Sequence, residues 1–141
     1  MPSLKLNLPE LIFAWQDQAA DNAYYLDTES GDVKLVNRNL LDLRDLTDEI
    51  ETNRERFIYV PKREKQHMIL DLKEFWSSVS DDKLRNILSM AFESPHVESA
   101  FKKILAPHPE QLERFESFMQ EKTKLRIEEW LQSHSLEYNF S

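Results

Sequence analysis

The chain has 141 residues, of which 40% are hydrophobic and 31% charged, and its formal net charge is −8. This length is typical of one domain, and eight Phe, four Tyr and three Trp supply the large core anchors that a disordered chain lacks. The absence of cysteine excludes disulfides, thiolate metal sites and cysteine nucleophiles, and it suits a reducing compartment. The negative charge repels phosphate backbones and anionic membranes, so it favours a basic protein partner over nucleic acid.

The first predicted element is a helix. No apolar run before it is long enough for a signal peptide, and the longest one, residues 11–15, is far too short to span a bilayer. We therefore expect a cytoplasmic protein without a membrane segment. Pro9 suits a first helical turn, and the apolar residues that follow recur at helical spacing. The predicted helix carries on one face Leu8, Leu11, Ile12, Trp15 and Ala19.

Two runs rich in aromatic and β-branched residues flank the one glycine of the chain. The runs cover residues 23–26 and 33–36, and Gly31 lies between them in a short polar turn. This pattern is typical of a β-hairpin in which glycine supplies a positive φ. A third strand is predicted at residues 57–60, before Pro61, and it should complete the sheet because an isolated hairpin is marginal in water.

The remaining segments have helical periodicity. Leu43, Leu46 and Ile50 indicate a short acidic helix before the third strand, and apolar stripes then predict helices over about 68–79, 84–92, 97–105 and 110–132. Ser80 is expected to cap the second of these four, and the last should be either broadly buried or bent near Thr123. The predicted fold is α+β: a small antiparallel sheet of about three strands with a covering N-terminal helix, followed by a helical second half of about four helices. All of it is expected to form a single domain over residues 1–141.

This order of elements, with two specific segments, resembles a known family. The segments are the Tyr-Tyr-Leu-Asp-x-Glu-x-Gly run at residues 24–31 and the closing Glu-Trp-Leu at residues 129–131. The chain is similar over nearly its whole length to the small bacterial proteins grouped as uncharacterised protein family 0158. It departs from that pattern at residues 97–99, where Val-Glu-Ser stands in place of an expected glycine. The resemblance implies one domain and a bacterial cytoplasm, and it transfers no activity, cofactor or site residue.

Three carboxylates around Gly31 suggest a calcium loop, but their spacing does not fit one. An EF-hand loop needs glycine at its sixth position and glutamate at its twelfth. Counting from Asp27, glycine falls at the fifth position and Arg38 at the twelfth. We therefore predict a solvated turn in which Asp27 or Asp32 accepts backbone N–H bonds.

No other pattern points to catalysis, a metal or a cofactor. The four histidines lack the spacing of a helical metal pair, a single glycine allows no phosphate-binding loop, and no serine lies in a nucleophile elbow. A hydrolase with a carboxylate site remains a possible class, but with 26 Asp and Glu residues no pair stands out. The sequence therefore assigns no catalytic residue, no metal ligand and no cofactor.

One segment reverses the local charge. Basic residues there bracket the third predicted strand, whose two aromatic residues alternate onto one face, as in proteins that bind single-stranded RNA. Alternatively, the aromatic residues face the core and the charges only solvate the strand ends. The possible binding surface consists of Arg54, Arg56, Phe57, Tyr59, Lys62, Arg63 and Lys65.

Two functional hypotheses follow. The first is a non-enzymatic protein-interaction or regulatory module that presents its acidic helix to a basic protein. The second is an RNA-binding accessory protein that uses the segment from Arg54 to Lys65. The acidic residues that motivate the first are Asp42, Asp45, Asp48, Glu49 and Glu51.

Overall fold

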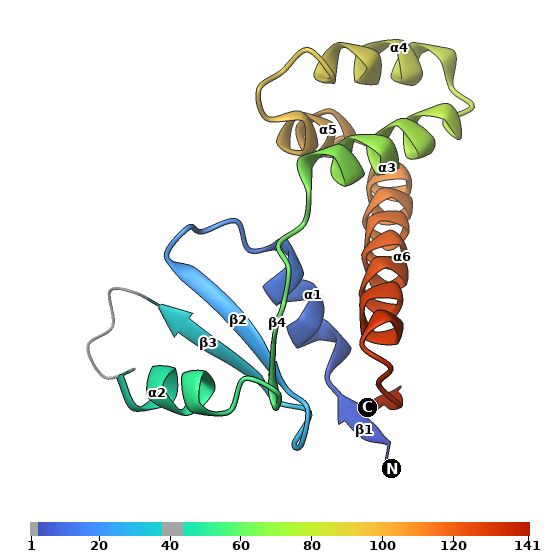
Figure 1. The fold of residues 1–141 in the computed structure, drawn as a ribbon. Helices are drawn as coiled ribbons and strands as arrows, with labels where there is room; N and C mark the ends of the chain where they lie inside the picture. The colour runs from blue at the N-terminus through green and yellow to red at the C-terminus, as the bar shows by residue number, and fades with distance from the viewer. Residues whose placement is uncertain (1–2, 38–43) are drawn as a thin grey trace. The chain divides into compact units, whose positions relative to one another are not determined.

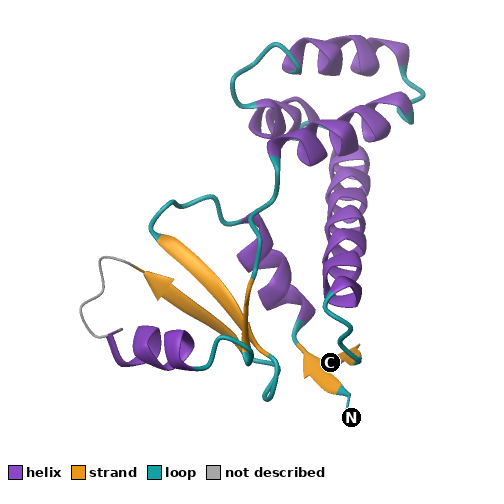
Figure 2. Ribbon diagram, in the orientation of Figure 1, coloured by secondary structure: helices purple, strands orange, loops and turns teal. Residues whose placement is uncertain are grey.

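The computed structural model describes residues 3–37 and 44–141, without the side chains of residues 44–46. The fold is α+β, as predicted, with strands and helices in the arrangement of Figures 1 and 2. The elements in chain order are β1 (Leu4–Leu6), α1 (Leu8–Gln16), β2 (Asn22–Asp27), β3 (Val33–Asn37), α2 (Arg44–Thr52), β4 (Phe57–Tyr59), α3 (Lys65–Ser77), α4 (Asp82–Ala91), α5 (Val97–Leu105), α6 (Pro109–Ser133) and β5 (Tyr138–Phe140).

The chain forms two compact units. The sheet unit comprises Met1–Arg63 with Thr123–Ser141, and the helical unit comprises Glu64–Lys122. Each has its own cluster of buried apolar side chains. The prediction of a single domain stays a prediction. No helix in the described ranges is long and apolar enough to cross a membrane.

The three predicted strands form one antiparallel sheet with the order β3-β2-β4. Its register places Tyr24 opposite Leu35, Tyr25 opposite both Lys34 and Tyr59, and Leu26 opposite Val33. Two more strands were not predicted: β1 and β5 pair in parallel and join the two ends of the chain. Each has only three residues, so neither shows enough alternation to be recognised in the sequence.

The core of the sheet unit lies where α1 covers the sheet, as predicted. Leu11 and Trp15 of α1 and Leu26 of β2 are buried in one cluster, together with Ile127 and Leu131 of α6. Successive strand residues point to opposite faces, so Tyr24 and Leu26 face this cluster while Tyr25 and Asp27 lie on the other face.

Helix α1 is shorter than predicted because the Asp17 side chain bonds the backbone just after the helix end. The helix stops at Gln16, and the Asp17 carboxylate accepts the backbone N–H of Ala19 at 2.9 Å. Such Asx bonding competes with the helical hydrogen bonds and turns the chain toward β2. Ala19 therefore lies outside the helix on which its spacing had placed it.

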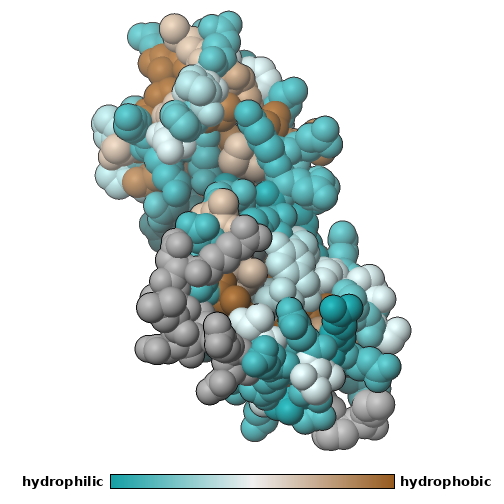
Figure 3. Space-filling model, turned by 60° about the vertical axis from the view of Figure 1, so that its left-hand side comes forward, coloured by the Kyte–Doolittle hydropathy of each residue, from teal (hydrophilic) through white to brown (hydrophobic). Residues whose placement is uncertain are grey.

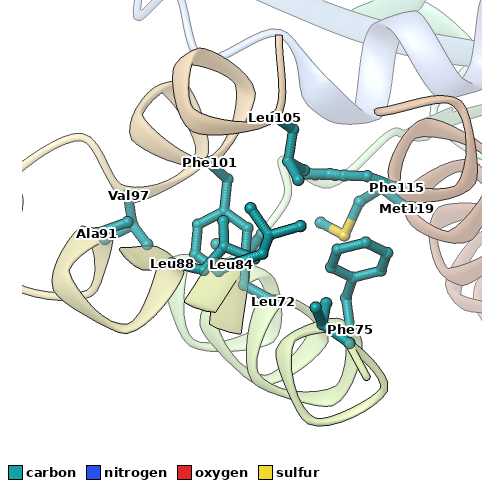
Figure 4. Close-up of a cluster of buried hydrophobic side chains, with 11 residues drawn as sticks. Leu72, Phe75, Leu84, Leu88, Ala91, Val97, Phe101, Leu105, Phe115 and Met119 are labelled. Carbon is teal, nitrogen blue, oxygen red and sulfur yellow. The ribbon is translucent and has the colours of Figure 1, made fainter. Parts of the chain in front are cut away.

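The helical unit packs α3, α4, α5 and the first part of α6 around aromatic residues (Figure 4). The ring centroids of Phe75 and Phe115 are 5.1 Å apart, and those of Phe101 and Phe115 are 5.8 Å apart. The prediction that Ser80 caps α4 is wrong. Asp81 is the N-cap, because its carboxylate accepts the N–H groups of both Lys83 and Leu84 and an anion is favoured at a helix N-terminus.

Helix α6 is a single helix whose buried residues recur every four positions. These residues are Phe115, Met119, Thr123, Ile127 and Leu131. Of the two alternatives for this helix, broad burial or a bend near Thr123, the first is wrong, because Leu125 is 46% exposed. The helix ends in a Schellman motif: Ser135 adopts φ 57°, and the N–H of Leu136 bonds the carbonyl of Leu131. This end redirects the chain into β5.

The predicted acidic helix is present as α2, although part of the prediction lies outside the described residues. Asp42 and Leu43 are not described, and the side chains of Asp45 and Leu46 are not described either. Ile50 is buried, as its position in the apolar stripe predicts.

The hairpin turn between β2 and β3 requires its glycine for two reasons. Gly31 has φ 82°, a region that other residues occupy only with strain. In addition, a Cβ atom there would collide with the backbone carbonyl oxygen of Lys5 in β1. The turn can therefore approach β1 only because residue 31 has no side chain.

Gly31→Ala should lower the free energy of unfolding by at least about 2 kcal/mol, because it adds both strain and a clash with backbone. Urea unfolding followed by tryptophan fluorescence measures this change. Asp32→Ala is the matched control, since it removes only an exposed ion pair of 3.9 Å with Lys34. Equal stability of the two variants would contradict the proposed contact with β1.

Candidate interaction surface

A buried ion pair organises the polar end of the sheet. The Asp27 carboxylate, 2% exposed at the end of β2, accepts two hydrogen bonds from the Arg56 guanidinium at 2.9 and 2.8 Å. Oδ1 of Asp27 also accepts the backbone N–H of Glu29 at 2.9 Å. The prediction that Asp27 accepts backbone N–H bonds in the turn is thus confirmed, but its carboxylate is buried rather than solvated. It also binds a cation from 29 residues further along the chain.

The pair shifts the pKa values of both partners. The hydrogen bonds from Arg56 hold the pKa of the Asp27 carboxyl well below its usual range, despite the opposing effect of burial. The same bonds raise the pKa of the Arg56 guanidinium. Glu29 and Glu49 lie 3.4 and 4.0 Å from this guanidinium and add weaker attraction. Arg56 is therefore neutralised within its own fold.

Above this pair lies a hollow of about 580 Å³, which we call the acidic hollow. It is lined by Thr28, Glu29, Glu51, Thr52, Asn53, Arg54, Glu55 and Arg56. The lining comes from the β2–β3 turn and from the end of α2 with the turn that follows it. Glu29, Glu51 and Glu55 are exposed on its rim. Glu51 and Glu55 form no ion pair with any residue that the structure describes.

The predicted basic surface is only partly assembled. Arg54 is exposed on the rim of the acidic hollow, while Arg56 lies in the ion pair. The Lys62 ammonium donates hydrogen bonds to the backbone carbonyls of Asp17 and Ala19, at 2.8 and 3.0 Å, just after α1. A cation is favourable at the Asp17 carbonyl because this residue is the C-cap of α1, whose C-terminal end carries partial negative charge.

The remaining basic residues have separate surroundings. The backbone N–H of Arg63 bonds the carbonyl of Trp15 at 2.8 Å, and its own carbonyl accepts the side-chain amide of Gln18. Lys65 begins α3 and belongs to the helical unit. The structure therefore places Arg54, Arg56, Lys62 and Arg63 in the sheet unit, in separate surroundings.

The two aromatic residues of β4 differ in exposure. Phe57 is 5% exposed, with the Arg56 guanidinium 5.1 Å from its ring centroid, while Tyr59 is 47% exposed. The Tyr59 ring meets that of Tyr25 edge-on, with centroids 5.7 Å apart. Both residues lie on the face of the sheet away from the core cluster, opposite Asp27 and Tyr25, and there Phe57 is buried while Tyr59 is exposed.

Hydrophilic side chains cover much of the visible surface of the sheet unit in Figure 3, whereas brown, apolar ones also reach the surface of the helical unit. The exposed apolar residues of the helical unit include Leu70, Ile87 and Met90. Within the described ranges, no three His, Asp or Glu side chains are grouped so that they could hold a metal ion.

The fold and this surface can now be set beside known proteins. The model of the uncharacterised protein family UPF0158 matches residues 2–141. The chain belongs to this family. UPF0158 proteins of Chlamydia pneumoniae and Chlamydia trachomatis serovar D are similar to it, with 23% and 22% identity over 97% of this chain. They are longer: the match covers 43% of each, so the chain spans less than half their length. No solved structure matches it.

The resemblance to family 0158 seen in the sequence is thus confirmed. Its most specific segment, residues 24–31 of this UPF0158 chain, includes Asp27 and Gly31, which the structure shows to be the anion of the buried pair and the glycine packed on β1. Sequence reasoning missed the pairing of Asp27 with Arg56, because the two are 29 residues apart. The available signal was an aspartate at a strand end and an arginine just before the next predicted strand.

Asp27→Asn should lower the free energy of unfolding by about 2 kcal/mol at neutral pH, since a charge-assisted pair is lost. The lowered pKa of the Asp27 carboxyl in the folded state means that unfolding takes up a proton. The ionised Asp27 carboxylate therefore contributes fully to the free energy of unfolding above about pH 5, and this contribution is lost as the pH falls toward 2.

Urea unfolding between these pH values measures both effects. The acid-side slope of stability against pH should be shallower in Asp27→Asn than in the unaltered protein. A residual slope is expected from Asp17, whose pKa is lowered to about 2, mainly by the hydrogen bond from Tyr24. Identical slopes in the two proteins would show that Asp27 is not held ionised by Arg56.

Proposed function

We propose that this UPF0158 chain is a non-enzymatic protein-interaction module whose acidic hollow binds a basic segment of a partner protein. The observation that carries the proposal is the rim of the acidic hollow, where Glu29, Glu51 and Glu55 are exposed around a concave surface of about 580 Å³. A basic side chain entering it would meet carboxylates from two different turns. The net charge of −8 adds an attractive long-range field for a cationic partner.

The acidic hollow has a hydrogen-bonded base and a rim of mixed charge, and both features bear on specificity. The Asp27–Arg56 pair joins the β2–β3 turn to the turn after α2, so the two backbone segments that carry the glutamates are connected. Arg54 on the same rim would repel a cation placed beside it. A partner would therefore have to direct its basic side chains toward Glu51 and Glu55 and away from Arg54.

The acidic helix α2 extends the same surface. Asp48 and Glu49 are exposed on α2, close in sequence to the rim residues. Carboxylates on one exposed helix attract basic partners mainly by raising the association rate. The lack of cysteine supports a reducing compartment, the cytoplasm, as the place where this binding occurs.

A second candidate function is RNA binding, and one observation favours it. Tyr59 is 47% exposed beside Tyr25, and Lys34 lies opposite Tyr25 in the register. An exposed aromatic ring next to a cation on a sheet is a surface on which a base can stack. Arg56 and Lys62 contribute less than the sequence predicts, because both already bind groups of their own chain.

Affinity capture with purified tagged protein tests the proposal, using lysate of the source cells with and without nuclease. We expect a protein partner that survives nuclease and elutes at raised salt. The double variant Glu51→Gln with Glu55→Gln should retain it at least about threefold less well, since each exposed ion pair contributes up to about 1 kcal/mol.

The matched control is Glu113→Gln with Glu116→Gln, which changes the net charge equally on exposed positions of α6. Equal loss in both double variants would mean that only overall charge matters, and it would contradict binding at the acidic hollow. Capture that disappears with nuclease and with Tyr59→Ala would establish the RNA-binding alternative instead.

A further inference from the structure

A second concave surface of the sheet unit lies between α1 and the β2–β3 hairpin. This groove, of about 450 Å³, is lined by Asn7, Pro9, Glu10, Phe13, Tyr24 and Val33. We call it the aromatic groove. It shares no residue with the acidic hollow.

The two aromatic residues of the groove differ in exposure, because Tyr24 is only 7% exposed and belongs to the buried cluster of the sheet unit. Phe13 is 67% exposed although it lies on the helix that covers the sheet. Its ring meets that of Tyr24 nearly edge-on, with centroids 6.4 Å apart. Leu35, 38% exposed, is the cross-strand neighbour of Tyr24 and lies on the same face of the sheet. Apolar surface therefore continues from the groove onto β3.

Tyr24 is held in place by a hydrogen bond to a carboxylate. Its hydroxyl donates to Oδ2 of Asp17 at 2.6 Å, and that carboxylate also accepts the side-chain amide of Asn22. Burial and the bond to Asp17 raise the pKa of Tyr24 to about 12, so its hydroxyl stays protonated at neutral pH and donates to the Asp17 carboxylate. Tyr24 therefore forms a fixed wall of the groove, and the exposed Phe13 ring is the aromatic face that a cation can approach.

The strand beside the groove has a free edge in the described sheet. In the order β3-β2-β4, β3 pairs on one side only. Asp27 N–H donates to the Asp32 carbonyl, so these two residues form a hydrogen-bonded pair of the antiparallel ladder. Hydrogen-bonded and non-hydrogen-bonded pairs alternate, so Val33 and Leu35 belong to non-hydrogen-bonded pairs. It follows that Val33 and Leu35 direct their backbone N–H and C=O groups away from β2. The same two residues direct their side chains to the face of the groove.

These two features lie side by side, and together they define a binding mode. We propose that an extended basic peptide segment of another protein adds as a fourth strand to the edge of β3 and inserts a lysine or arginine side chain into the aromatic groove. The surface is separate from the acidic hollow, so the proposal stands apart from the function proposed above.

The chemistry of the groove selects the side chain. The exposed Glu10 carboxylate on the rim forms no ion pair with any described residue, so it is available to a cation. The aliphatic stem of lysine or arginine suits the apolar walls formed by Pro9, Phe13 and Val33, while its charged end reaches the Glu10 carboxylate and the exposed Phe13 ring. Backbone pairing with β3 supplies affinity, and the groove supplies selection for a basic residue.

Nuclear magnetic resonance titration of the ¹⁵N-labelled full chain tests this, with a short capped peptide of alternating lysine and threonine as the probe. On addition to the edge, the period of two places every lysine on the groove side. We expect the amide chemical shifts of Val33 and Leu35 to change and to reach saturation as peptide is added. Phe13→Ala should abolish these changes without lowering the melting temperature, because Phe13 is mostly exposed. Glu10→Gln should weaken binding about threefold.

Three controls separate the proposed mode from general attraction. The same peptide N-methylated at alternate residues on its pairing edge should bind at least about tenfold more weakly, because it cannot form the strand hydrogen bonds. A glutamate–threonine peptide should not bind. Glu51→Gln with Glu55→Gln should leave the shifts at Val33 and Leu35 unchanged.

The proposal would be overturned by no saturable shift at millimolar peptide, or by equal binding of the N-methylated peptide. It would also be overturned by shifts confined to the residues around Glu51 and Glu55. That last result would support the acidic hollow while removing the groove, so the two proposals can fail independently.

Discussion

The bidentate pair between Asp27 and Arg56 is the constraint on which the surface of the sheet unit depends. It connects the end of β2, the hairpin turn and the segment that enters β4, and it draws Glu29 and Glu49 toward one guanidinium. A carboxylate that is 2% exposed is stable there only because a cation and a backbone N–H satisfy its oxygens. Because Asp27 neutralises the charge of Arg56, the exposed charges around the acidic hollow are mostly those of glutamates.

The parts of the fold that could be predicted are those encoded by local pattern. The hairpin around Gly31 was recognisable because aromatic and β-branched runs flank a glycine with the backbone freedom that the turn needs. The helices were recognisable from apolar residues at helical spacing. The parts that could not be predicted depend on distant partners. The β1–β5 pairing joins Leu4 to Tyr138, and the position of Lys62 depends on carbonyls at the end of α1.

The candidate site likewise has parts that the local sequence predicts and parts that depend on distant contacts. The sequence indicated that basic and aromatic residues lie together from Arg54 to Lys65, and it left open which of them are exposed. Burial in the fold separates Phe57 from Tyr59, and intramolecular bonds occupy Arg56 and Lys62. What remains available to a partner is a set of carboxylates around a hollow and, on separate residues, an aromatic groove beside a free strand edge. We propose that each of these surfaces binds a basic polypeptide segment.

The most direct measurement of the central constraint is a double-mutant cycle of unfolding free energies for Asp27→Asn, Arg56→Gln and the double variant at neutral pH. If the pair organises this end of the sheet, Arg56→Gln destabilises the unaltered protein far more than it destabilises the Asp27→Asn variant. Additive effects of the two substitutions would contradict the account, because they would mean that Asp27 and Arg56 stabilise the fold independently of each other.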